Sequence, residues 1–209
     1  MYTIGFAVVV LLACKQGKHY HDEVQKMESS ISEIASIVQW QTDLNETFKN
    51  PETSPLPDRF RKDFRGLDFF PPDTSYIVKA RIKRTPDAEP FLMPTTTDKK
   101  SREVVFGIVH FWLNGREHQL EVYQNLDGGP IQRRRLFLPF YDETNGEETY
   151  GGGRYIDLAI PKEDSIIIDF NKAYNPYCVY NKKYSCPLVP RQNYLRTNVR
   201  AGVKDFQSD

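Results

Sequence analysis

The sequence predicts a mainly β (α+β) fold: an antiparallel curled sheet or barrel with an N-terminal amphipathic helix and an irregular C-terminal wrap. In the first quarter of the chain, apolar residues recur every three or four positions, which is typical of a helix. From residue 76 onward this period falls to two, which is typical of half-buried strands. Strands and helices do not alternate, so a parallel α/β sheet is not expected.

The composition allows one domain and excludes no soluble fold. The 209 residues carry 28 Lys and Arg against 28 Asp and Glu, so the formal net charge is zero. Nothing in the overall charge therefore favours nucleic acid, and no nucleic-acid partner is expected. The 13% aromatic content is high and indicates a β-rich core, with tyrosines that can also line a pocket.

The N-terminus looks like an export signal. Residues 4–13 form a run of ten apolar or small residues, which is too short for a helix that spans a membrane. We predict a signal peptide over residues 1–13, although no Lys or Arg precedes the run. The ending Leu-Leu-Ala-Cys resembles the lipobox of bacterial lipoproteins, which implies lipidation of Cys14. The alternative is a buried N-terminal strand that contains an ordinary core cysteine.

The resemblance to a lipobox also implies a location. The protein would be exported and lipid-anchored to a bacterial membrane through Cys14, on its periplasmic or extracellular face. Residues 14–22 are polar after the cysteine and are predicted to form a tether.

Residues 23–50 are predicted to form the N-terminal helix. Their apolar stripe consists of Val24, Met27, Ile31, Ile34 and Val38, at spacings of three and four. Since Pro51 follows, the helix should end near residue 50. We expect the stripe to pack on the protein's own domain, with a partner helix as the alternative.

Residues 51–209 are predicted to form one β-rich domain. Strands are expected at 76–83, 103–113, 117–125, 134–141, 154–160 and 165–170. Asn114-Gly115 separates the second and third of these runs and is a strong hairpin signal. The last forty residues are rich in proline and aromatic residues, which indicates an ordered wrap without regular structure.

Residues 54–206 resemble domain of unknown function 1684 (DUF1684), a family of bacterial and archaeal proteins. The resemblance rests on FLPFYDETNGEETYGGGRYIDL, IIIDFNKAYNPYCVYNKKYSCPLVPRQN and VRAGVKDF. It covers about three quarters of the chain, and only Val203 departs from the motifs, where the family pattern has Glu. The resemblance implies a shared fold and brings no activity with it.

A binding site is predicted around the glycine-rich loop that begins at Tyr150. Gly152 and Gly153 let the backbone approach another group, and Arg154 presents a planar fork suited to carboxylate or phosphate. The preferred alternative is a structural role, in which Arg154 pairs with a buried Asp169 or Asp142.

Three polar residues near the end of a predicted strand complete the candidate binding set. Asp169, Asn171 and Asn175 could cap turns, or they could line a pocket with Tyr150, Tyr155 and Tyr174.

Cys178 and Cys186 are separated by seven residues. In an exported chain whose first cysteine is lipidated, the remaining pair most readily forms a disulfide. Free thiols and a metal site are the alternatives, but a zinc site would need two more ligands. No metal site and no cofactor is expected.

The sequence leaves three functions open. It lacks GxSxG, HExxH and CxxC, so we expect a domain that binds a small ligand or an envelope partner. One alternative is a hydrolase-type envelope enzyme that uses Tyr150, Arg154, Asp169 and Asn171, with Asp169 as acid or base. The other is a purely structural envelope protein.

Overall fold

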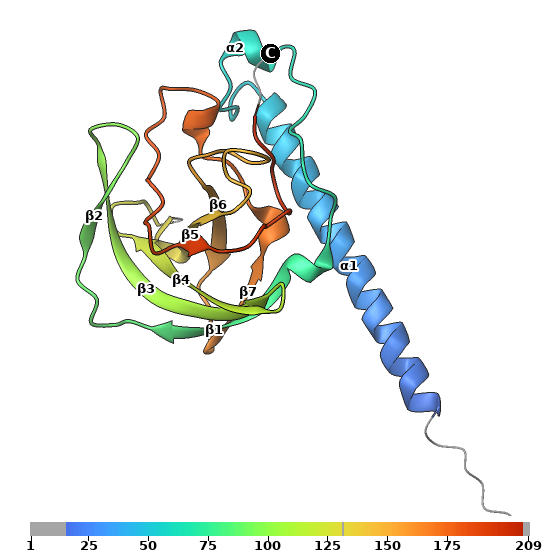
Figure 1. The fold of residues 1–209 in the computed structure, drawn as a ribbon. Coiled ribbons are helices and arrows are strands. Elements are labelled where there is room, and N and C mark those ends of the chain that lie inside the picture. Colours follow the sequence, from blue (N-terminus) through green and yellow to red (C-terminus); the bar gives the residue numbers. More distant parts are fainter. Residues whose placement is uncertain (1–15, 131, 207–209) are drawn as a thin grey trace, which may run out of the picture.

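The computed structural model describes residues 16–130 and 132–206. Eight strands form one curled sheet beside a long N-terminal helix, as Figure 1 shows. The strand order is β6-β5-β4-β3-β1-β7, with β2 added beside β3 and β8 beside β5. The strands are β1 (Ile77–Arg84), β2 (Phe91–Pro94), β3 (Lys100–Leu113), β4 (Arg116–Asn125), β5 (Arg135–Asp142), β6 (Arg154–Ala159), β7 (Ser165–Asp169) and β8 (Tyr194–Leu195).

The predicted fold class is confirmed. All pairings are antiparallel except the two-residue pairing of β8 with β5. The β3–β4 hairpin turns at Asn114 and Gly115, whose φ angles are 50° and 74°. Two positive φ angles in succession suit the right-handed twist of a hairpin, which is why Asn-Gly predicted the turn correctly.

A bulge near Gly107 helps the long strand β3 to curl. The register with β4 shifts between Val105 and Gly107. A Cβ atom at Gly107 would lie 2.8 Å from the Lys83 carbonyl oxygen, so only glycine permits this approach to β1.

Two apolar clusters hold the molecule together. The larger one fills one face of the sheet, with residues such as Val109, Leu138 and Ile168. The smaller one joins the C-terminal part of the helix, through Trp40, Leu44 and Phe48, to the C-terminal wrap. The wrap is ordered, as the sequence predicted, and it also contributes to a core.

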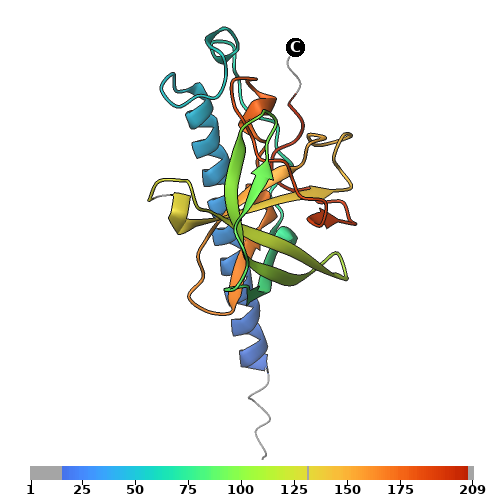
Figure 2. The same ribbon diagram turned by 90° about the vertical axis from the view of Figure 1, so that its left-hand side faces the viewer.

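Helix α1 (Gln16–Lys49) is longer than predicted. Residues 16–22 belong to it, so most of the segment predicted as a tether is helical. The polar residues there include no proline, and a helix that is already nucleated extends through such a segment at little cost. Figures 1 and 2 show that the N-terminal part of α1 leaves the β-domain, while its C-terminal part lies against it.

The face of α1 that packs on the domain differs from the predicted stripe. Met27, Ile31 and Val38 are 58%, 62% and 47% exposed, whereas Ile37 and Phe48 are 0% and 1% exposed. The helix has apolar residues on two faces, and the β-domain covers the one that contains Ile37 and Phe48. The prediction that Met27, Ile31 and Val38 face the core was therefore wrong.

Short helical turns connect the remaining segments. They are α2 (Asp58–Arg61) and the 3-10 turns η1 (Thr74–Tyr76), η2 (Gln132–Arg134), η3 (Phe170–Lys172) and η4 (Tyr177–Val179). An antiparallel bridge between Phe69 and Val203 fixes the end of the wrap beside the segment that follows α2.

Candidate functional site

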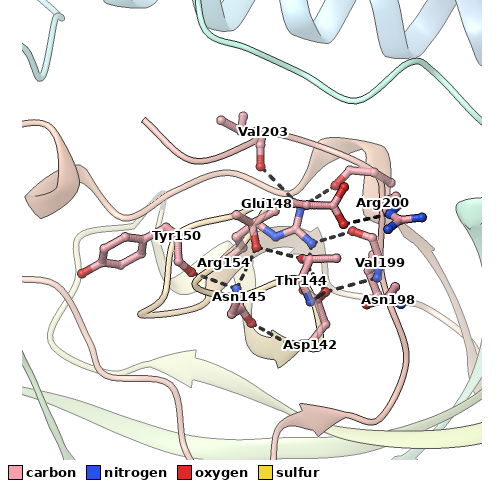
Figure 3. Close-up of polar contacts among 12 residues, drawn as sticks. Asp142, Thr144, Asn145, Glu148, Tyr150, Arg154, Asn198, Val199, Arg200 and Val203 are labelled. Carbon is pink, nitrogen blue, oxygen red and sulfur yellow. Dashed lines mark hydrogen bonds and ion pairs between the residues drawn. The ribbon is translucent and has the colours of Figure 1, made fainter. Parts of the chain in front are cut away.

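Arg154, the centre of the predicted site, is sealed inside the protein. Its side chain has no exposed surface, and its Nη2 lies 2.8 Å from the Oδ2 of Asp142, which is equally buried. Nη2 also donates to the Val199 carbonyl at 2.8 Å, and Nη1 donates to the Ala201 carbonyl at 2.5 Å (Figure 3). Burial lowers the pKa of Arg154, and the Asp142 carboxylate opposes this shift.

Asp142 is equally well partnered. Its Oδ1 accepts hydrogen bonds from the Thr144 amide at 2.9 Å, the Thr144 hydroxyl at 2.6 Å and the Val199 amide at 3.2 Å. The pair thus ties the end of β5 to the following loop and to the C-terminal wrap. This is the structural alternative that the sequence suggested, with Asp142 as the partner.

The glycines beside Arg154 serve the chain's own packing. A Cβ atom at Gly152 would lie 2.3 Å from the Tyr150 ring. Gly153 has φ of 86°, and a Cβ atom there would lie 2.8 Å from the Phe140 carbonyl oxygen. Glycine is required at Gly153 by its positive φ and by the backbone of β5, whereas at Gly152 a larger residue would have to displace the Tyr150 side chain.

Asp169 and Asn171 organise a turn. The Asp169 side chain caps η3 by accepting from the Asn171 amide at 3.1 Å. The Asn171 side chain makes two hydrogen bonds to the backbone of Asp73, at 3.0 and 2.9 Å. Asn175 donates to the Lys204 carbonyl at 2.9 Å. The structure therefore shows the turn-capping role for Asp169, whereas the side chains of Asn171 and Asn175 tie this part of the chain to segments far away in the sequence.

The seven predicted binding residues do not meet in one pocket. The structure instead has an "aromatic hollow" of three adjoining cavities of about 430, 580 and 360 Å³, all of which Asp157 lines. Tyr150, Gly152, Gly153, Arg154, Asp169, Asn171 and Asn175 are absent from its lining. The hollow is lined by Trp40, Leu44, Ser101, Glu103, Asn125, Arg134, Arg135, Leu136, Phe137, Tyr155, Asp157, Leu158, Ala159, Lys172, Tyr174, Tyr177, Tyr184, Ser185, Cys186 and Pro187.

Strand register explains how the sequence builds the floor of this hollow. Phe137 of β5 lies opposite Tyr123 of β4 and opposite Asp157 of β6. Directly opposed residues of antiparallel strands share a face, so these three side chains point to the same side. The alternate residues Leu136 and Leu138 point to the core instead, where both are fully buried.

Segments far apart in the sequence close the sides of the hollow. Helix α1 contributes Trp40 and Leu44, and the C-terminal wrap contributes Tyr177, Tyr184 and Pro187. The Tyr155 hydroxyl donates to the Pro187 carbonyl and so fastens the wrap to β6.

Asp157 stands at the junction of the three cavities. Although 43% of its side chain is exposed, its crowded position raises its pKa through desolvation, against the opposing effects of the Tyr174 hydroxyl and Arg135. Arg135 Nη1 lies 3.6 Å from Asp157 Oδ2, and 61% of the arginine side chain is exposed. Such an exposed ion pair contributes about 0–1 kcal/mol, so either partner can turn to a ligand at little cost.

Glu103 is a second carboxyl group in the hollow, and it is only 2% exposed. Its Oε1 accepts from the Ser101 hydroxyl and from the Asn125 side-chain amide, both at 2.6 Å. Its Oε2 is buried and has no hydrogen-bond partner in the described part of the chain. Burial raises the pKa of Glu103, and the two hydrogen bonds offset part of this shift.

The two C-terminal cysteines lie side by side at the edge of the hollow. Both are free thiols in the structure, and Cys186 Sγ accepts a hydrogen bond from the Cys178 amide at 3.1 Å. Burial, with the neighbouring Cys178 thiol, raises the pKa of Cys186 to about 12. Their disulfide stays a prediction, and so does lipidation of Cys14, which lies outside the described residues.

Most of the hollow was not predicted from the sequence. Of the residues singled out there, Tyr155, Tyr174 and Cys186 line it. The alternation in RYIDLAI places Asp157 on the same face as Tyr155, and this signal could have identified the carboxyl group. Nothing in the local pattern links Trp40 or Tyr184 to that strand, because their proximity arises only from tertiary packing.

Two negative findings apply to residues 16–130 and 132–206. No three His, Cys, Asp or Glu side chains among them gather as a metal site would require. No helix there has an apolar stretch long enough to cross a membrane.

Comparison with known proteins places this architecture in a family without assigning an activity. Residues 62–204 match the family described as "Protein of unknown function (DUF1684)". The solution NMR structure of an uncharacterized protein from Haloarcula marismortui is similar, with 32% sequence identity and a TM-score of 0.64. The match covers 88% of this chain and 96% of the archaeal one. No curated protein matches.

Proposed function

Because the chain belongs to the DUF1684 family, whose function is unknown, we propose a function from its own geometry: it binds a small organic ligand in the aromatic hollow. The supporting observation is the convergence of three cavities on Asp157, beneath aromatic side chains from α1, β5, β6 and the wrap. Ligand pockets of a few hundred Å³ that combine aromatic walls with a few polar groups are the usual form of small-molecule sites.

The geometry gives less support to the other functions. The enzyme alternative depended on Arg154 with Asp169 and Asn171, yet Arg154 is fully buried and the other two side chains hold a turn. A purely structural role would explain the Arg154 network but would leave the aromatic lining of the hollow without a purpose.

The binding proposal can be tested with the protein's own fluorescence. The chain has two tryptophans, and Trp112 is 67% exposed on β3, so Trp112→Phe leaves Trp40 as a reporter inside the hollow. We expect Trp40 emission to change in a saturable way with at least one class among aromatic acids, aromatic amines and uncharged aromatic compounds.

A matched pair of variants locates the binding. Tyr184→Ala removes an aromatic wall of the hollow and should weaken binding about fivefold, since one aromatic contact contributes about 1 kcal/mol. Tyr194→Ala removes a tyrosine that is 47% exposed elsewhere and should leave affinity within about twofold. If no class of compound binds, or if both variants behave alike, the hollow is not the ligand site.

We also propose that this binding takes place at the cell envelope. The proposal rests on the apolar run at 4–13 and the lipobox-like Cys14, and it would place the hollow outside the cytoplasm. Such a location would favour a disulfide between Cys178 and Cys186, whose close approach is compatible with one. Intact mass after alkylation of native, unreduced protein from the envelope should show neither thiol modified. Two alkylated thiols would rule out the disulfide.

A further inference from the structure

We propose, on the premise that the hollow is a ligand site, that its ligand is an organic anion with an aromatic body. The body would lie in the first cavity, and the anionic group would lie in the second, against Arg134, Arg135 and Lys172. The two cavities are contiguous because Trp40, Asp157 and Tyr174 line both of them.

The first cavity suits the aromatic body. Trp40, Phe137 and four tyrosines stand around it, and the tyrosines are Tyr155, Tyr174, Tyr177 and Tyr184. Phe137 and Tyr155 already meet edge to face, with centroids 4.7 Å apart, as do Tyr177 and Tyr184 at 5.4 Å. Aromatic rings in such arrangements gain roughly 0.5–1.5 kcal/mol beyond their area burial, so a further ring is favoured there.

The second cavity suits the anionic group. Its lining contains three cationic side chains, Arg134, Arg135 and Lys172, and one carboxyl group, Asp157. The side chains that line this cavity therefore carry a net positive charge even when Asp157 is fully ionised, although the protein as a whole carries no net charge.

These cations are weakly engaged by the protein. Arg134 has no ion pair within the described residues. Arg135 meets Asp157 only at 3.6 Å, and Lys172 meets Asp169 at 3.4 Å and the Ser36 hydroxyl at 3.2 Å. An anion that contacts both arginines would gain charge-assisted hydrogen bonds that these loose pairs do not supply.

The same charges disfavour an aromatic ligand that carries a positive charge. An aromatic box beside a carboxylate can hold an ammonium group through cation–π attraction, which contributes about 0.5–2 kcal/mol. In the second cavity such a cation would face three positive side chains and one carboxyl group, and each surplus unit charge at about 4 Å costs about 1 kcal/mol in water. The charges of this cavity therefore oppose the cation–π attraction.

Two fluorescent probes that differ by one charge test the inference. They are 8-anilinonaphthalene-1-sulfonate and its uncharged parent, N-phenyl-1-naphthylamine, titrated into the full chain carrying Trp112→Phe. We expect the sulfonate to bind about tenfold more tightly than the parent, a difference of about 1.4 kcal/mol. This difference in affinity should shrink as the NaCl concentration is raised, since salt screens exposed charges.

Charge-removing variants show where the advantage arises. The double variant Arg134→Gln/Arg135→Gln should weaken the sulfonate about tenfold and leave the parent unchanged. The matched control Arg81→Gln/Lys83→Gln removes two exposed charges from β1 and should affect neither probe. Ile31→Ser on the exposed face of α1 should also affect neither, which excludes binding to that face.

The outcomes separate this inference from the proposed function. The anion inference is overturned if both probes bind with equal affinity, or if the affinity of the sulfonate is unchanged in the Arg134→Gln/Arg135→Gln variant. In either case the hollow remains a binding site. If Trp40 responds to neither probe, nor to any aromatic acid, amine or uncharged compound, both proposals fail together.

Discussion

At the scale of single residues, the protein treats two buried carboxyl groups in opposite ways. Asp142 pairs with Arg154, and its Oδ1 accepts three further hydrogen bonds. Glu103 has donors for Oε1 alone, and its Oε2 is unpartnered within the described residues. The first group stabilises the fold, whereas the second is held in a position that costs stability. Glu103 also lines the third cavity, so a ligand there would lie beside this carboxyl group.

Replacing Glu103 with Gln should reveal this cost. The pKa of Glu103 is raised in the folded state above its ordinary 4.5, so the folded protein binds more protons than the unfolded chain between these two values. The contribution of Glu103 to the stability of the wild type must therefore fall as pH rises through that window. We expect Glu103→Gln to raise the free energy of unfolding by about 1 kcal/mol at neutral pH. The gain should disappear below about pH 4.5, where Glu103 is protonated in both states.

Denaturant unfolding at pH 4 and pH 7 measures this effect. Glu117→Gln provides the matched control, because Glu117 is exposed on the neighbouring strand and should change stability by less than about 0.5 kcal/mol at either pH. A Glu103→Gln variant that is destabilised equally at both pH values would mean that the carboxyl group is well accommodated.

At the scale of elements, α1 has two apolar faces and uses one of them. Ile37 and Phe48 are covered by the β-domain, whereas Met27, Ile31 and Val38 remain exposed. The covered face gives α1 its attachment, and it also positions Trp40 at the hollow.

The same substitution on the two faces should have different consequences. Ile37→Ala removes a side chain that is 0% exposed and should cost about 2–5 kcal/mol of folding free energy. Ile31→Ala acts on a side chain that is 62% exposed and should stay within about 0.5 kcal/mol, because alanine also favours the helix. Thermal or denaturant unfolding of the two variants makes the comparison. Equal losses would indicate that the face containing Ile31 is covered in solution.

The elements differ in how well the sequence predicts them. The hairpin of β3 and β4 was predictable because alternation and the Asn-Gly turn are local signals. Strands β2 and β8 were missed, since they are four and two residues long and are formed by pairing more than by their own pattern. The burying face of α1 was predicted wrongly because a period of 3.6 identifies a helix but does not say which apolar face the domain will cover.

The candidate site was also predictable only where the signal is local. The pairing of Arg154 with an aspartate could be anticipated, since an arginine buried in a sheet needs a counter-charge. The hollow could not, because Trp40, Asp157 and Pro187 meet only after α1 and the wrap have packed against the sheet.

At the scale of the whole molecule, the sheet alone makes no binding site. The curled sheet supplies a floor of Phe137, Tyr155 and Asp157, and the two ends of the chain supply the walls. The C-terminal part of α1 packs against the wrap in the smaller apolar cluster, through residues such as Phe48 and Tyr180. Ligand binding should therefore depend on the attachment of both.

The proposed anchor is tested on the intact protein in cells. Cys14→Ala removes the only thiol that a lipobox-like signal could modify and should move the protein from the membrane fraction to the soluble fraction. Replacement of Lys15 by Gln next to it is a control for local sequence change. Unchanged partitioning of Cys14→Ala would show that a lipid on this cysteine does not hold the protein.

The protruding part of α1 would form a rigid spacer between such an anchor and the β-domain. From Gln16 to Ser29 the backbone is helical, a length of about 20 Å, before the helix reaches the β-domain. A flexible chain of this size would let the domain wander over a similar distance in any direction. In an anchored protein a rigid rod would instead act as a lever arm: it would set the height of the hollow above the membrane and would convert tilting at its foot into a sweep of the whole domain.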